Sequence, residues 1–216
     1  MKIIKGKNII ERKEILIPSN FVKTIIEFGS GDGKELYKLA RENPKNFHIG
    51  IEPNEKALEK VTKQIYKKPA KGGLENIIFL KASVQQVDSS LFHSADEVFV
   101  SFPWGSLLEG IVKADPEVIF GIKNVLKNGA IASFTLAYDD KYEENYLKER
   151  QMPKLNLEFL ETTFAAKLKE FGLTLKLARL MQDGEKKNIK SSWGKKILEK
   201  RDREVYEVIL QNSGYN

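Results

Sequence analysis

Short apolar runs alternate with amphipathic segments along most of this chain. Each run is rich in β-branched or aromatic side chains, which predicts buried strands. The predicted strands are Thr24–Phe28, Phe47–Glu52, Ile77–Leu80, Glu97–Phe102 and Ala130–Ala137. Between them apolar positions recur at helical spacing, and the predicted helices are Gly33–Glu42, Glu55–Tyr66 and Pro116–Leu126. This alternation predicts an α/β fold, with a parallel sheet covered by helices on both faces.

The last third of the chain departs from this alternation. A helical pattern over Leu155–Phe171 leads to two strand-like runs, Leu173–Leu180 and Glu204–Leu210. A basic loop, residues 184–203, joins the two runs. Two consecutive strands joined in this way predict an antiparallel pair that closes the sheet.

The first residues form a small extension. Lys2–Glu11 places a glycine between two short apolar runs, which predicts a β-hairpin inside an extension of residues 1–20. The sequence shows no internal repeat and no interdomain linker. We therefore expect one domain over residues 1–216, built on a seven-stranded, mostly parallel sheet with an N-terminal β-hairpin.

Composition excludes several kinds of site. The chain has no cysteine, which excludes disulfides, thiolate zinc sites and a cysteine nucleophile. Its two histidines, His48 and His93, are too few for a metal centre of imidazoles, so we expect no metal. No apolar run approaches the ~20 residues of a membrane helix, and the N-terminus does not resemble a signal peptide. We expect a cytoplasmic protein without a membrane partner.

A glycine-rich loop follows the first buried strand and precedes a helix, which is the context of a cofactor loop. Gly29 and Gly31 belong to it, but Lys34 stands where a dinucleotide loop needs its last glycine. Glu27 and Asp32 would repel a pyrophosphate and suit the positively charged amino and sulfonium groups of S-adenosylmethionine. The alternative is a plain turn in which Asp32 caps the helix.

Two further strand ends extend this prediction. Glu52 ends the second strand, at about the ~20-residue offset of a ribose-binding acid. Val84 and Gln85 follow the third strand, where the adenine of the cofactor would lie. An ordinary turn at this second position would have the same sequence pattern.

A proline and two aromatic residues end the fourth strand, where ligands of such sheets bind. The carbonyl groups of Phe102 and Pro103 could accept the amino hydrogens of an adenine, and Trp104 offers a flat ring for stacking. Trp193, in the basic loop, could cover the other side of a base that has been flipped out of its helix. The alternative for Trp193 is packing of the loop onto the body of the protein.

Charge is informative through its placement. The formal net charge of +6 also fits an ordinary solvated surface. The positive charge is concentrated in the Lys67–Lys71 cluster and in the basic loop, which indicates a nucleic-acid partner.

Three segments resemble one family of enzymes. Ile49–Pro53, Lys67–Leu74 and Phe102–Glu109 are similar to the aminoglycoside-resistance 16S rRNA methyltransferases, in particular to the branch that methylates N1 of adenine 1408 in the decoding site. The similarity extends from the hairpin to the last strand. It implies a Rossmann-like class I methyltransferase that uses S-adenosylmethionine and acts on the 30S ribosomal subunit. We expect a monomer.

The resemblance also implies roles for single residues. Glu27, Gly29 and Glu52 would hold the methionine and ribose ends of the cofactor. The whole expected cofactor site consists of Glu27, Gly29, Gly31, Glu52, Val84, Gln85, Phe102, Pro103, Ser106 and Ser191. The family usually has a glutamate where this chain has Gln85, so the sequence departs from its pattern there.

The remaining implied roles concern RNA. Trp104 and Trp193 match two tryptophans that clamp the target adenine, and Arg203 matches an arginine that holds the flipped nucleotide. The expected RNA-binding residues are Lys67, Lys68, Lys71, Lys196, Arg201 and Arg203. Because adenine N1 already has an in-plane lone pair, we expect catalysis by positioning and no general base.

Three alternatives remain open from the sequence. A tRNA (guanine-N7)-methyltransferase shares the second strand and a Pro-Trp pair, but usually has an aspartate where Phe102 stands. A small-molecule methyltransferase would not need two basic segments. A non-catalytic RNA-binding module would bind RNA without binding S-adenosylmethionine.

Overall fold

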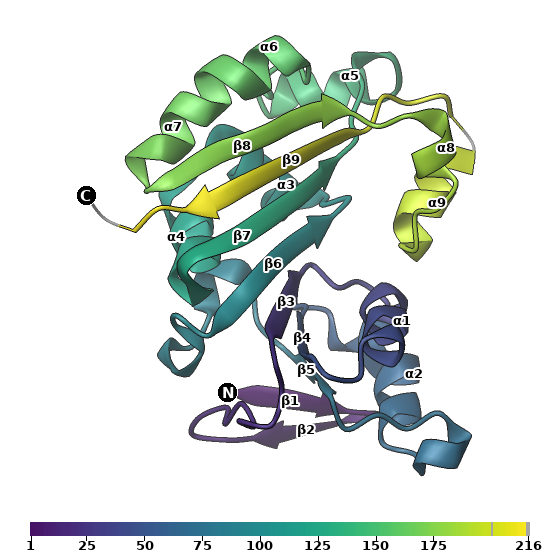
Figure 1. The fold of residues 1–216 in the computed structure, drawn as a ribbon. Coiled ribbons are helices and arrows are strands. Elements are labelled where there is room, and N and C mark those ends of the chain that lie inside the picture. The colour runs from purple at the N-terminus through teal and green to yellow at the C-terminus, as the bar shows by residue number, and fades with distance from the viewer. Residues whose placement is uncertain (200, 215–216) are drawn as a thin grey trace.

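The computed structural model describes residues 1–199 and 201–214, so Lys200 of the predicted basic loop lies outside the described residues. The strands are β1 (Lys2–Lys5), β2 (Asn8–Glu11), β3 (Thr24–Phe28), β4 (Phe47–Ile51), β5 (Ile77–Leu80), β6 (Ala95–Ser101), β7 (Leu126–Leu136), β8 (Leu173–Leu180) and β9 (Tyr206–Asn212). Within this part of the chain they form one nine-stranded sheet in the order β2-β1-β5-β4-β3-β6-β7-β9-β8 (Figure 1).

The predicted sheet of seven strands is therefore two strands too small. β3 to β7 pair in parallel, and β9 pairs antiparallel with β8, as predicted. β9 also pairs antiparallel with β7, which was not predicted. The N-terminal hairpin joins the same sheet because β1 lies antiparallel to β5, with Ile3 opposite Leu80. The hairpin thus covers an edge of the parallel sheet that would otherwise be unpaired.

The helices are α1 (Lys34–Glu42), α2 (Glu55–Ile65), α3 (Gly105–Lys113), α4 (Pro116–Val125), α5 (Asp140–Glu149), α6 (Leu157–Phe159), α7 (Ala165–Glu170), α8 (Asp183–Lys186) and α9 (Ser192–Glu199). α1 and α2 lie beside β3 to β5, and α6 and α7 lie along β8 (Figure 1). None of the helices in the described ranges is long and apolar enough to cross a bilayer.

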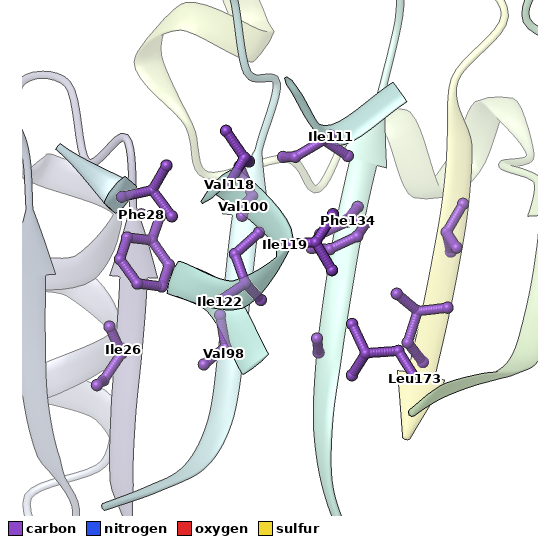
Figure 2. Close-up of a cluster of buried hydrophobic side chains, with 14 of the residues drawn as sticks. Ile26, Phe28, Val98, Val100, Ile111, Val118, Ile119, Ile122, Phe134 and Leu173 are labelled. Atoms are coloured by element: carbon purple, nitrogen blue, oxygen red, sulfur yellow. The ribbon is translucent and has the colours of Figure 1, made fainter. Parts of the chain in front are cut away.

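Helices cover both faces of the sheet, and each face has its own apolar cluster. Leu36 of α1 and Leu58 of α2 pack on Phe79 on one face. On the other face, Ile119 and Ile122 of α4 lie in the larger cluster, which Figure 2 shows between α3, α4 and the sheet. The all-apolar strands are explained by this burial on both sides.

Several boundaries differ from the predicted ones. α4 ends at Val125 and β7 begins at Leu126, four residues earlier than predicted, because polar residues interrupt the apolar pattern at Lys127 and Asn128. The predicted helix over Leu155–Phe171 is divided by a π-helical turn at Leu160–Phe164. The basic loop contains α8 and α9, and α3 and α5 were not predicted.

Candidate functional site

A cavity of about 520 Å³ lies at the carboxyl ends of β3, β4 and β6. Four segments meet there: the glycine loop after β3, the turn after β4, the start of α3 and the start of α9. The predicted site residues that line it are Glu27, Gly29, Gly31, Glu52, Phe102, Pro103, Trp104, Ser106, Ser191, Trp193 and Lys196. The fold thus brings together residues that are up to 169 positions apart in the sequence.

The glycine loop is closed by a carboxylate from the next strand. Glu52 accepts a hydrogen bond from the backbone N–H of Gly31 at 3.0 Å through one oxygen, and from the N–H of Asn54 at 3.0 Å through the other. Gly31 has a φ of 54°, which an L side chain rarely adopts. Glu52 therefore fixes the loop while it lines the cavity.

Two further carboxylates, the buried Glu27 and the half-buried Glu35, lie in the cavity wall. Glu27 is only 2% exposed, and its Oε2 atom has no hydrogen-bond partner among the described residues. Burial, followed by repulsion from Glu35, raises the pKa of Glu27 well above its usual range. Burial also raises the pKa of Glu35. Hydrogen bonds from the hydroxyl groups of Ser101 and Ser191 partly offset this rise in pKa. This part of the wall is suited to a positively charged ligand group.

Glu35 was not predicted as a site residue. It occupies the first turn of α1, where an acidic side chain is ordinarily explained by the helix dipole. Nothing in the sequence shows that this turn faces the cavity.

The segment between β6 and α3 is shaped to present Trp104. Phe102 has a φ of 50° although it is not glycine, and such strained backbone is typical of ligand sites. Phe102 is buried, and its ring lies where any side chain at Gly194 would collide, 2.5 Å from the position of a Cβ atom. This contact joins the end of β6 to α9, which carries Trp193.

The two tryptophans both border the cavity and are half exposed. Trp104 is 41% exposed and Trp193 is 44% exposed, which is unusual for the largest apolar side chain. Both also line an adjoining hollow with Arg201 and Arg203. The exposure of Trp193 favours a ligand contact over the alternative that it merely packs the loop onto the body.

The other predicted residues lie outside the main cavity. Val84 and Gln85 line a separate hollow, which shares Ser106 with the main cavity. Lys67, Lys68 and Lys71 are exposed on the turn after α2. The lysine cluster thus lies on a different segment of the chain from either tryptophan.

Arg203 is held by an acidic residue that the sequence did not reveal. It is 5% exposed and forms a bidentate ion pair with Glu143 of α5, whose side chain is 8% exposed. Arg201 donates to the same carboxylate at 2.9 Å. The guanidinium groups of both arginines also lie about 5 Å from the ring of Tyr142. No periodicity could predict this pairing, because its partners are about 60 residues apart.

Similarity to known proteins decides the family of this chain. The family model for 16S rRNA (adenine(1408)-N(1))-methyltransferases matches residues 2–211. This chain belongs to that family. The 16S rRNA (adenine(1408)-N(1))-methyltransferase of Escherichia coli is 32% identical over 212 residues, which cover 96% of this chain and 97% of that protein.

Solved structures agree with this membership. A variant of the 16S rRNA (adenine(1408)-N(1))-methyltransferase from Catenulisporales acidiphilia, solved with its cosubstrate SAM, is 25% identical with a TM-score of 0.88, over 99% of this chain and 97% of that one. The aminoglycoside resistance methyltransferase NpmB1 is 28% identical with a TM-score of 0.81, over 98% of each chain. The predicted family, its methyltransferase fold and its S-adenosylmethionine cofactor are confirmed.

The buried ion pair yields a prediction about stability. Replacing Glu143 with alanine leaves the buried Arg203 guanidinium without its main partner, and we expect a loss of about 3–5 kcal/mol in the free energy of unfolding. Glu144→Ala is the matched control, since Glu144 is an exposed neighbour that pairs with the exposed Lys148. Urea unfolding of both variants measures the difference. Equal midpoints for the two would show that the buried pair does not stabilise this fold.

Proposed function

We propose that this protein transfers the methyl group of S-adenosylmethionine to N1 of adenine 1408 in the 16S rRNA of the 30S subunit, and thereby gives aminoglycoside resistance. The observation that carries the proposal is the combination in one cavity of buried carboxylates and two half-exposed tryptophans. The first suits a cationic cofactor and the second suits a planar base. Membership of the family supports the same substrate.

We assign the cofactor to the acidic part of the cavity. Glu27 and Gly29 would hold the methionine end, and Glu52 would accept the ribose hydroxyl groups. The adenine would extend past Ser106 toward Val84 and Gln85, since Ser106 borders both hollows. When bound, S-adenosylmethionine supplies a methyl group that is already activated by its sulfonium.

We assign the target adenine to the space between Trp104 and Trp193. Stacking on aromatic rings contributes ~1–3 kcal/mol per base and offsets part of the cost of flipping. The carbonyl groups of Phe102 and Pro103 would accept the exocyclic amino hydrogens of the base. Since N1 carries its own lone pair, the protein only needs to align it with the methyl group.

We assign docking to the basic residues of the exposed lysine loop and to those beside the two tryptophans. Lys67, Lys68 and Lys71 form an exposed cluster on one loop, and Lys196, with Arg201 and Arg203, lies beside the tryptophans. Contacts from two separate segments favour recognition of the folded subunit rather than of a short base sequence. We further propose that the chain acts as one domain and as a monomer in the cytoplasm, where its ribosomal substrate lies.

Primer extension across the decoding site tests this function. N1 methylation blocks the pairing edge of adenine and stops reverse transcriptase. We expect a stop at adenine 1408 after incubation of intact 30S subunits with the protein and S-adenosylmethionine, and a weaker stop with protein-free 16S rRNA. The absence of a stop, despite measured cofactor binding, would contradict the proposal and would favour tRNA as the substrate.

A variant of Trp104 tests the clamp. Removing one stacking face in Trp104→Ala should slow methylation about tenfold or more, because one aromatic contact to the base is lost. Trp104→Phe retains a ring and should keep most of the rate. Single-turnover rates on 30S subunits measure both variants, and wild-type turnover in Trp104→Ala would rule out the clamp.

The raised pKa of Glu27 predicts how cofactor affinity depends on pH. In the free protein the carboxyl group stays protonated up to its raised pKa, whereas a bound cation favours the carboxylate. Binding should therefore release a proton, and affinity should rise with pH by up to about tenfold per unit below that pKa.

Calorimetric titration in buffers of different ionisation enthalpy measures this release. Glu27→Gln should bind more weakly and lose the pH dependence, whereas Glu59→Gln, at a partly exposed residue of α2 paired with Lys63, should retain it. The same pH dependence in Glu27→Gln would assign the proton to another group.

A further inference from the structure

The ring of Trp104 is stacked on a second aromatic residue that the proposed mechanism does not use. Tyr146 of α5 lies against it with ring centroids 4.8 Å apart and an interplanar angle of 19°. Trp104 lines the main cavity and the adjoining hollow, whereas Tyr146 lines neither of them. Tyr146 therefore packs on one face of the Trp104 ring, and 41% of Trp104 remains exposed.

Tyr146 is itself supported from behind. The Arg150 guanidinium carbon lies 4.5 Å from the centroid of its ring, one turn further along α5, in a cation–π contact. Arg150 in turn pairs with Glu109 of α3 at 3.6 Å. Glu109 also accepts from Lys113 at 2.7 Å, so its carboxylate is held in place. Trp104, Tyr146 and Arg150 thus form one continuous stack.

The stack is anchored to the segment that it supports. Trp104 immediately precedes α3, and the Tyr146 hydroxyl donates a long hydrogen bond of 3.4 Å to the carbonyl group of Gly105. Both ends of the stack therefore contact α3 or its first turn. Displacement of the Trp104 ring would break its stacking contact with Tyr146.

Trp104 needs such support because the local backbone does little to fix the orientation of its ring. It stands between two residues with left-handed backbone, Phe102 at φ 50° and Gly105 at φ 61°, and its side chain makes no capping hydrogen bond. An exposed ring on such a turn would occupy several rotamers if nothing packed against it. Fixing it before the base arrives avoids an entropic cost on binding.

We propose that Tyr146 is a positioning residue, which holds the Trp104 ring in the orientation that receives the flipped adenine on its other face. This inference rests on the proposed function, because it assumes that Trp104 stacks on the base. Arg150 and Glu109 extend the support from α5 to α3.

The restraint on Trp104 is measurable without any RNA. The chain has two tryptophans, so a Trp193→Phe background leaves Trp104 as the only indole reporter. In that background we expect Tyr146→Ala to raise the acrylamide quenching constant of Trp104 about twofold and to lower its fluorescence anisotropy. Tyr146→Phe, which keeps the ring, should match the parent. Identical quenching in both variants would overturn the proposal.

The catalytic consequence is measured with Trp193 intact. Single-turnover methylation of saturating 30S subunits should slow about threefold to tenfold in Tyr146→Ala, as expected for the loss of one aromatic pair. Tyr146→Phe should retain the rate, and affinity for S-adenosylmethionine should not change in either. A Tyr146→Ala rate equal to wild type would overturn the positioning role.

Two controls keep these outcomes separate. If Tyr146→Ala lacks a cooperative melting transition, Tyr146→Leu replaces it, since leucine retains apolar burial without a stacking ring. A wild-type protein that methylates no 30S subunit contradicts the proposed function, whereas the quenching comparison still decides whether Tyr146 restrains Trp104.

Discussion

The parallel pairing of β3 with β4 on one side and β6 on the other determines where every element of the site lies. Glu27 stands opposite Gly50 of β4 and Phe99 of β6, so the three strands end at one edge. The pairing requires glycine at position 50, because a Cβ atom there would lie 2.4 Å from the Phe79 ring and 2.7 Å from the Ser30 hydroxyl. Close packing of the strands thus brings the glycine loop against the sheet.

The site at this edge contains unfavourable interactions that a bound ligand can relieve. Glu27 and Glu35 are carboxyl groups in a poorly solvated wall, and burial raises the pKa of both. Phe102 adds strained backbone at the rim. In the free protein these features cost stability. A cationic cofactor would compensate the acidic wall, and under the proposed function a planar base would stack on the tryptophan that the strained turn presents. The site is therefore built for ligands at the expense of the empty protein.

The sequence predicted those parts of the fold that depend on local pattern. The five parallel strands were recognisable because burial on both faces makes them largely apolar. Glu52 was recognisable because it follows the second of these strands. α5 was missed because it buries only Leu147 and has little apolar periodicity. The hairpin was predicted, but its pairing with β5 was not, since an edge contact leaves no mark in the pattern.

Long-range side-chain contacts could not be predicted from the sequence either, because they leave no mark in the local pattern of apolar and polar residues. The Glu143–Arg203 ion pair and the Trp104–Tyr146 stack each join α5 to a distant segment, and each involves residue types that are ordinary on an exposed helix. Their significance arises only when the sheet places α5 beside the end of β6. Most of the predicted site residues line the cavity, whereas the sequence was silent on the residues that hold this lining in place.

The most direct test of the account is a cryo-electron microscopy structure of the protein on the 30S subunit with a non-reactive analogue of the cofactor. We predict that adenine 1408 is flipped out between Trp104 and Trp193, with N1 facing the position of the transferable methyl group. An adenine that remains stacked in its rRNA helix, or a base held away from both tryptophans while the analogue occupies the cavity, would contradict it.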